Sequence, residues 1–414
     1  MSLSYVSGRD NESKVPMSSK NGNFTVIHLS TGHLGGAGLA ARRLNAALNN
    51  AGISSRFYAL GRRDFVPEAN EFTIDRNIFI RFLSYLTTAL QERVSSRIFF
   101  SILSLNSLPN NFEKELENLE NPILHIHNWY NLINLRSLKS FAKIGIPIVI
   151  TLHDQRIMTG GCHYSFECKR FTSTCDNCPG ISPKLKKIPR FVLSRSGINL
   201  QGLNQDLTFV APSKWMLNQA QQSKLLESFE TRFIPNVLHQ QEDSIHSTKV
   251  SGSSNNSIVF GIASMDPTSF VKGGDIVSTL IQEVESKKLP YQFSFMKSFP
   301  QDQSGLEEFW HSLDYLLVFS RAENSPNVIH EAKFYGVPVI ATKTGGITEL
   351  LHSEFDLGVD TTQSSPSEIL RKIENFLSIG YSRPELASMR AQHEKYAGKA
   401  LVSHIHLYRE LKSK

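Results

Sequence analysis

Two carboxylates lie eight positions apart in the stretch SRAENSPNVIHEAKFYGVPVIATKTGGITEL, at Glu323 and Glu331. Glu323 falls in a polar loop after a short apolar run, and Glu331 falls more than one turn into a predicted helix. The first residues of a helix carry backbone N–H groups without intrahelical partners, which makes a helix start a ready site for phosphate. A diphosphate bound there would have one carboxylate near each end. Alternatively, Glu331 is a solvated helix residue and Glu323 an ordinary loop charge.

The elements around these glutamates form a predicted strand–loop–helix–strand unit. The apolar run 314–319 is typical of a buried parallel strand. Pro326 stands where a helix would begin, with Ser325 before it as the predicted cap. The helix would extend over 327–335, and 337–341 would be the next strand. The loop therefore lies at the carboxyl end of its strand, where open parallel sheets bind ligands.

The E-x7-E spacing, followed by VPVIATKTGGITEL, resembles the retaining glycosyltransferases of family 4, which have the GT-B fold. The form AENSPNV is similar to that of bacterial members that build surface polysaccharides. The resemblance extends from about residue 24 to about residue 411. It implies that Glu331 holds the ribose hydroxyls of a nucleotide-sugar and that Glu323 contacts the transferred sugar. It also places four residues between them at the donor: Asn324, Ser325, Pro326 and Asn327.

A glycine-rich segment near the start of the chain is a second candidate phosphate site. The apolar run 24–29 predicts a buried strand, and TGHLGGAG then leads into a helix that would expose Arg42 and Arg43. Glycines between a strand and a helix let the backbone approach a phosphate closely, although they also suit a tight turn. The resemblance implies that Gly35 and Gly36 face the donor diphosphate.

A lysine beside two glycines opens the second half of the chain. Lys272 follows a predicted strand at 258–263 and precedes a predicted helix at 275–284, a position suited to pairing with a phosphate. The resembling family often has an arginine several residues before this lysine. Residues 264–271 include no basic side chain, which weakens the expected clamp on the diphosphate. Arg321 is the residue that could compensate.

Histidines mark the end of two further predicted strands, 123–127 and 147–152. A side chain at the carboxyl end of a parallel strand points into the ligand crevice, although many such histidines only cap a loop. The resembling family has an equivalent histidine near the transferred sugar, so His153 is the second candidate catalytic residue, beside Glu323. Three neighbours could line an acceptor site: His127, Asn128 and Trp129.

All four cysteines lie within 17 residues of one loop, 160–180, at Cys162, Cys168, Cys175 and Cys178. Such clustering in a chain without an export signal argues against disulfides. Four thiolates would form a closed, tetrahedral, structural zinc site. The spacing C-x5-C-x6-C-x2-C ends in a CxxC pair, but its first half departs from the common finger spacings. The alternative is two buried or redox-sensitive thiol pairs.

The stretch 74–103 mixes apolar and basic residues in a helical pattern. One face of a helix would carry Ile78, Phe79, Phe82, Leu83, Leu86 and Leu90, and the interleaved basic residues are Arg76, Arg81, Arg93 and Arg97. This pattern suits an amphipathic helix lying on a membrane surface. It also suits a helix packed on the core of its domain.

The 414 residues are enough for two α/β domains, and a composition of 40% apolar and 20% charged residues is ordinary for a globular protein. The resemblance implies an α/β protein with the GT-B fold, in which two doubly wound Rossmann-like domains face each other across a cleft. The predicted parts are a disordered leader (1–23), an acceptor-side domain (24–237), a linker (238–256), a nucleotide-sugar-binding domain (257–395) and a C-terminal helix that returns to the first domain (396–414).

Neither a signal peptide nor an apolar run of 18 residues is found, which predicts a cytoplasmic protein. Peripheral contact with the inner face of the plasma membrane remains open, since a net charge of +6 and a pI of about 9.0 permit attraction to anionic lipid. The charge also permits nucleic acid as a partner, but scattered basic residues without an aromatic–basic array argue against it.

The resemblance implies that a hexosyl group moves from a nucleotide-diphosphate sugar to an acceptor hydroxyl with retention at the anomeric carbon. The acceptor would be a glycan or a lipid-linked saccharide in the biosynthesis of a cell-surface polysaccharide, such as O-antigen, capsule or exopolysaccharide. No D-x-D pair stands where a metal would bind the diphosphate, so no catalytic metal is expected. Two alternatives stay open: a non-catalytic subunit of a polysaccharide assembly, or a nucleotide-sugar 2-epimerase of related fold.

Overall fold

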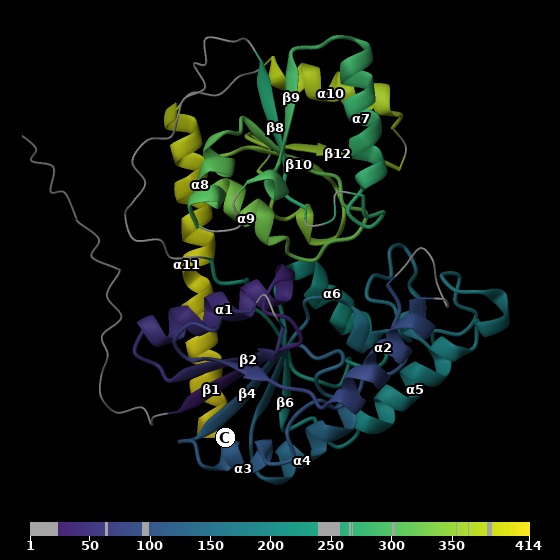
Figure 1. Cartoon of the computed structure of the whole chain (residues 1–414), viewed down its shortest axis with the longest axis vertical. Helices are drawn as coiled ribbons and strands as arrows, with labels where there is room; N and C mark the ends of the chain where they lie inside the picture. The colour runs from purple at the N-terminus through teal and green to yellow at the C-terminus, as the bar shows by residue number, and fades with distance from the viewer. Residues whose placement is uncertain are drawn as a thin grey trace, which may run out of the picture.

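The computed structural model describes residues 24–62, 65–92, 99–238, 257–264, 266, 268–299, 303–352, 354–362, 364–378 and 383–414. The described residues form two α/β units, each built on a parallel sheet (Figure 1). The predicted leader at 1–23 and almost all of the predicted linker at 238–256 lie outside the described residues. The predicted α/β class with two doubly wound units is confirmed.

The first sheet has seven parallel strands in the order β3-β2-β1-β4-β5-β6-β7. Their bounds are Thr25–Ser30 (β1), Ser55–Leu60 (β2), Glu71–Ile74 (β3), Pro122–Asn128 (β4), Ile148–Thr151 (β5), Leu207–Ala211 (β6) and Thr231–Phe233 (β7). Every residue of β1 is buried, as expected for a parallel strand that is covered on both faces. The strand order reverses between β1 and β4, which makes the carboxyl end of this pair a natural ligand crevice.

The helices of the first unit are α1 (Gly35–Asn50), α2 (Ile78–Glu92), α3 (Phe112–Glu117), α4 (Leu138–Lys143), α5 (Ile188–Leu200) and α6 (Lys214–Gln222). Because α1 begins at Gly35, the two glycines occupy the first helical turn and not a loop before the helix. Ser213 caps α6, since its Oγ accepts a hydrogen bond from the Met216 N–H at 3.0 Å.

The second sheet has five parallel strands in the order β12-β11-β10-β8-β9, and it reverses between β8 and β10. The strands are β8 (Ile258–Ile262), β9 (Tyr291–Phe295), β10 (Tyr315–Val318), β11 (Val339–Thr342) and β12 (Leu357–Val359). The helices are α7 (Gly274–Ser286), α8 (Gln303–His311), α9 (Asn327–Phe334) and α10 (Pro366–Leu377). The loop with Glu323 and the loop with Lys272 thus lie at one switch point.

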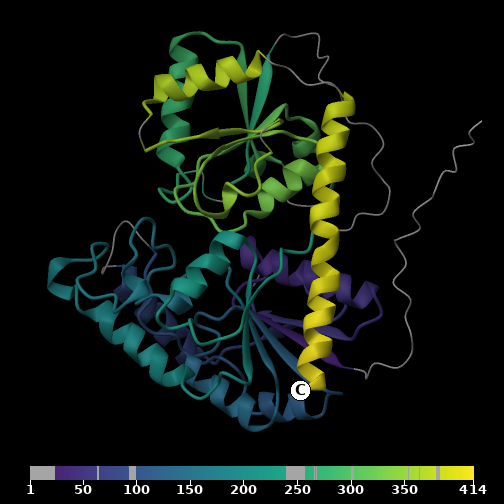
Figure 2. The same ribbon diagram turned by 180° about the vertical axis from the view of Figure 1, so that it is seen from behind.

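The last helix, α11 (Arg383–Ser413), runs along both units (Figures 1 and 2). Its Leu407 and Tyr408 are buried against Val26 and Ile123 of the first unit. Close to its end, Arg232 donates two hydrogen bonds of 2.7 Å to the carboxylate of Glu410. The last part of α11 therefore packs on the first unit, and residue 396, the predicted start of the C-terminal helix, lies inside α11.

Candidate active site

The loops after β8 and β10 bring Lys272 and Glu323 together. The Lys272 ammonium forms an ion pair with the Glu323 carboxylate, which also accepts a hydrogen bond of 3.2 Å from Ser320 Oγ. Gly273, in the left-handed region at φ 73°, allows this approach, because a Cβ there would lie 2.0 Å from the Phe319 carbonyl oxygen. The sequence placed both residues at the site, and the structure shows that they are each other's partners.

Glu331 faces the other unit of the protein. Its carboxylate forms an ion pair with Arg43 of α1, and both side chains are largely buried. The prediction that Arg42 and Arg43 are exposed is wrong. Arg42 binds the carboxylate of Glu71, in β3 of the first unit, at 2.6 Å. Arg43 is therefore a functional candidate that sequence reasoning missed, since only the packing of α1 against α9 brings it to the site.

The segment between the two glutamates joins the units. The Asn324 amide donates a hydrogen bond of 2.5 Å to the Leu152 carbonyl and accepts one of 2.6 Å from Ser213 Oγ. The Asn327 amide donates to the Gly36 carbonyl at 3.0 Å. The side chains of both asparagines thus hold the units together, and a role at the donor would fall to their backbone groups.

The start of α9 carries no side-chain cap. Pro326 occupies the N-cap position, and Ser325, the predicted cap, instead shares a hydrogen bond of 3.0 Å with Nε2 of the buried His330. The start of α1 also lacks a side-chain cap, and a Cβ added to Gly35 or Gly36 would meet no atom within 4 Å. Because Asn327 bonds to Gly36, two uncapped helix starts meet at this point, which suits an anionic group.

Arg321 has another partner and is not turned toward a phosphate site. Its guanidinium makes two hydrogen bonds, of 2.6 and 2.7 Å, to Asp275 in the first turn of α7, and it lies 4.1 Å from the ring centre of Phe270. The proposed compensation by Arg321 therefore finds no support. Arg43 is the arginine that the fold brings to the glutamates.

A cavity at the carboxyl ends of β4 and β5 gathers the residues predicted for the acceptor and sugar. Its lining includes His127, Asn128, Trp129, His153 and Asp154. Nε2 of His153 lies 3.1 Å from Nδ1 of His127. Burial lowers the pKa of His153 to about 4. At neutral pH the His153 ring is therefore uncharged and can exchange single hydrogen bonds with a sugar hydroxyl.

The histidine chain continues into the core. Nε2 of His127 lies 3.0 Å from Nδ1 of His28. Among the described residues, His28, His125 and His127 are the trio whose metal-ligand atoms all lie within 4.8 Å of one another. However, the nitrogens of His125 already share hydrogen bonds of 2.7 Å with the hydroxyls of Tyr408 and Thr151. These rings therefore act as hydrogen-bonded core.

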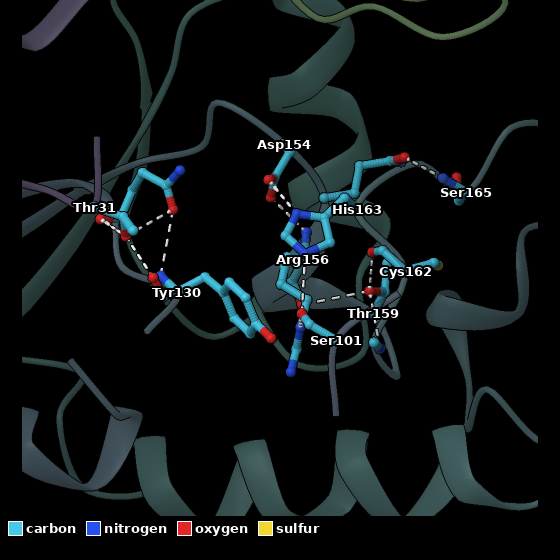
Figure 3. A network of polar contacts seen from close by, with 12 residues as sticks. Thr31, Ser101, Tyr130, Asp154, Arg156, Thr159, Cys162, His163 and Ser165 are labelled. Atoms are coloured by element: carbon cyan, nitrogen blue, oxygen red, sulfur yellow. Dashed lines mark hydrogen bonds and ion pairs between the residues drawn. The ribbon is translucent and has the colours of Figure 1, made fainter. Parts of the chain in front are cut away.

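A polar network beside this cavity was not foreseen from the sequence (Figure 3). His163 shares hydrogen bonds of 2.7 Å with Asp154 and 2.9 Å with Ser101, and Arg156 donates to the same serine at 2.7 Å. Burial raises the pKa of the Asp154 carboxyl, but His163 and Arg156 outweigh burial and hold that pKa below its ordinary value.

Tyr164 connects this network to the glutamates. Burial raises the pKa of its hydroxyl, and the nearby carboxylates of Glu323 and then Asp154 raise it further. Tyr164 thus lies on the side of the network that faces Glu323. The only signal in the sequence was its place two residues after the first cysteine, in GCHYS.

The four cysteines surround a separate cavity, which is also lined by Phe100, Thr159, Gly160 and Phe171. All four are free, so none forms a disulfide.

Comparison with known proteins identifies the type of enzyme. Residues 267–378, which include Lys272 and both glutamates, match the family "Glycosyl transferases group 1". The chain thus contains a region of the group 1 glycosyltransferase type. The chain is 23% identical, over 390 residues, to the putative colanic acid biosynthesis glycosyl transferase WcaC of Escherichia coli K12. That alignment covers 85% of this chain and 88% of WcaC.

Solved structures of similar fold support the architecture of this chain. Sucrose-phosphate synthase from Thermosynechococcus elongatus superposes with a TM-score of 0.58 at 12% identity, covering 94% of this chain and 99% of that one. HepE from Anabaena, in complex with UDP and glucose, gives 0.52 at 15% identity and covers 94% of this chain and 100% of its own. At these identities the likeness shows the shared GT-B fold.

Proposed function

We propose that this glycosyltransferase moves a hexosyl group from a nucleoside-diphosphate sugar to an acceptor hydroxyl, with retention, during assembly of a cell-surface polysaccharide. The observation that carries the proposal is the convergence of Lys272, Glu323 and Glu331 on the switch point of the second sheet and the uncapped start of α9. The likeness to WcaC favours a surface polysaccharide as the product. The UDP and glucose in HepE favour a UDP-sugar as the donor.

Each side chain has a distinct part in the proposed reaction. Lys272 and the N–H groups at the start of α9 stabilise the negative charge that develops on the departing diphosphate. Glu331 accepts hydrogen bonds from the ribose hydroxyls, and Glu323 contacts the transferred sugar. Lys272 can bind phosphate while it stays near Glu323, because an ammonium has three N–H donors. The uncharged His153 exchanges a hydrogen bond with a sugar hydroxyl from the opposite unit.

Replacing Lys272 by alanine is expected to weaken binding of the intact donor by about 10-fold or more, because a hydrogen bond to a charged group contributes about 1.5–3 kcal/mol. Binding of the bare nucleoside should hardly change, since the proposed partner is phosphate. Calorimetry with UDP-, GDP- and ADP-sugars, and with the matching nucleosides, measures both quantities. Lys287→Ala is the matched control, because Lys287 follows the end of α7 and pairs with Glu283 at 3.1 Å.

Equal losses for the donor and the nucleoside would remove Lys272 from the phosphate site. A wild-type protein that binds none of these donors and hydrolyses none would instead be a non-catalytic subunit. Interconversion of the donor sugar without an acceptor would identify an epimerase.

We further propose that α2 holds the acceptor side of the enzyme against an anionic membrane, where a lipid-linked saccharide would be presented. Three large apolar side chains of α2 are exposed: Ile78 is 86% exposed, Phe79 65% and Phe82 57%. Arg81 is exposed among them, and the pI is about 9.0, so the face complements anionic lipid. No helix in the described part of the chain could span a bilayer.

The double variant Phe79→Asp/Phe82→Asp is expected to reduce binding to phosphatidylglycerol vesicles at least about 10-fold, because two inserted rings are lost and two like charges are added. Co-sedimentation with vesicles of phosphatidylglycerol or phosphatidylcholine measures the effect. Val402→Asp, at a half-exposed position of α11, is the control and should bind as the wild type does. This role for α2 would be rejected if the wild-type protein bound neither kind of vesicle. It would also be rejected if the double variant bound phosphatidylglycerol vesicles as strongly as the wild type does.

A further inference from the structure

The four cysteines converge on one cavity although they come from a segment with little regular structure. Between the strand β5 and the helix α5, the Cys-rich loop (160–180) contains a single 3-10 turn, Arg170–Thr172. Phe171 and Cys175 of this loop are buried, but most of its central side chains are exposed or half-buried. Apolar packing alone gives the loop few contacts with which to offset its conformational entropy. All four thiols nevertheless line the same small cavity.

The backbone around the last two cysteines presents N–H groups to sulfur. The Gly160 N–H donates to Cys175 Sγ at 3.3 Å. The backbone N–H groups of Gly180 and Ile181 are likewise directed at the sulfur of Cys178. The CxxC turn is closed by two residues in the left-handed region, Cys175 at φ 52° and Asn177 at φ 53°. N–H groups directed at sulfur stabilise negative charge on it, as a metal-bound thiolate requires.

The surroundings do not favour the alternative of reactive thiol pairs. Redox-active and nucleophilic cysteines have a lowered pKa in an electropositive, accessible setting. Here Cys175 is buried, the other three cysteines are only partly exposed, and none of the four forms a disulfide. Among common partners for such thiols, a divalent metal ion supplies the positive charge that converts them to thiolates.

We propose that Cys162, Cys168, Cys175 and Cys178 bind one Zn²⁺ ion, which fixes the Cys-rich loop beside the cavity at the carboxyl ends of β4 and β5. Four thiolates without an open position are the ligand set of a structural zinc site, and soft sulfur ligands favour Zn²⁺ over the harder Mg²⁺ and Ca²⁺. Among the described residues, the cysteines include no trio with all sulfurs within 4.8 Å, so the ion must draw them together.

The ion would order more than its own loop. Directly beside Cys162, the N–H of Ser101 donates to the Gly161 carbonyl at 2.8 Å and the N–H of His163 donates to the Phe99 carbonyl at 3.0 Å. The next residue is Tyr164, which lies on the side facing Glu323. The Cys-rich loop is thus tied to the segment after α2, where His163 also shares a hydrogen bond with Ser101 (Figure 3), and His163 forms one wall of the cavity that His153 lines. Zinc is expected to position this wall without contacting the substrate.

Elemental analysis of the purified full chain tests the proposal. About one Zn²⁺ per chain is expected, and a mercurial reagent should release it in step with modification of the four thiols. Cys175→Ser and Cys178→Ser should each lose the metal and expose residues 160–180 to limited proteolysis. Ser173→Ala is the matched control in the same loop, because Ser173 is exposed and bonds only locally to the Arg170 carbonyl at 3.2 Å. It should retain full zinc.

The mercurial titration uses the wild-type chain, so it decides the question even where a cysteine variant fails to fold. Metal-free protein with four titratable thiols and no chelator effect on its melting temperature would overturn the proposal. So would the absorption of an iron–sulfur cluster, or a disulfide found by mass spectrometry. Zinc content does not depend on donor binding, so this result and the test of the transferase activity can fail separately.

Discussion

Glu323→Gln is expected to lower the turnover number by about 100-fold or more, while the affinity for the donor stays the same or rises. A preorganised polar group that stabilises the charge developing in the transition state contributes a rate factor of about 10²–10³. In the structure, Glu323 also holds the ammonium of Lys272. Neutralising the carboxylate frees Lys272 for the diphosphate, so binding and turnover should move in opposite directions. Turnover with the preferred donor, together with calorimetry on the same preparation, measures both.

Glu331→Gln provides the contrast that makes this result specific. It should weaken donor binding by about 10-fold or more through the loss of a charged hydrogen bond to ribose. Its effect on turnover at saturating donor should be smaller. Glu285→Gln, an exposed position near the end of α7, is the control for a lost carboxylate. If both site variants transfer sugar at the wild-type rate and with wild-type affinity, the assignment of the glutamates is wrong.

The sequence predicted the part of the site whose structure depends on residues close together in the chain. The unit around the glutamates has a strand at Tyr315–Val318 and a helix at Asn327–Phe334, each within two residues of the predicted bounds. Apolar runs, a proline at the helix start and a glycine after the helix act within a few residues of one another. These signals therefore predict the strand and the helix without knowledge of the tertiary structure.

The failures have tertiary causes. Ser325 was predicted to cap the helix, but its hydroxyl forms a hydrogen bond with Nε2 of the buried His330 instead. Nδ1 of the same ring lies 3.0 Å from Nε2 of His393 in α11. Arg43 looked solvated, because its partner Glu331 is 288 positions away in the chain. The edge strands Glu71–Ile74 and Tyr291–Phe295 were not predicted, since short strands with exposed positions lack a strong apolar run. Local spacing contains no information about these contacts.

The buried histidines predict that the folded protein loses stability in acid. Burial lowers the pKa of His28 to about 3, of His153 to about 4 and of His404 to about 4. In the unfolded chain these rings have pKa values near 6.5, so between about pH 6.5 and pH 4 the unfolded state binds more protons. Stability is therefore fully present above pH 6.5 and is lost as the pH falls through this window. Buried histidines with the same direction of shift are His125, His127, His330 and His393.

We expect the free energy of unfolding to fall between pH 6.5 and 5 with an uptake of at least about three protons, because each fully linked proton contributes roughly 1.4 kcal/mol per pH unit. Most carboxylates titrate below about pH 5, so this window reports mainly on histidines. Urea unfolding at closely spaced pH values gives the slope. His28→Asn, whose amide can replace Nδ1 as the partner of His127, should reduce the uptake by about one proton. His406→Asn, at an exposed position of α11, should leave the slope unchanged, and a pH-independent stability of the wild-type chain would contradict the uncharged histidine core.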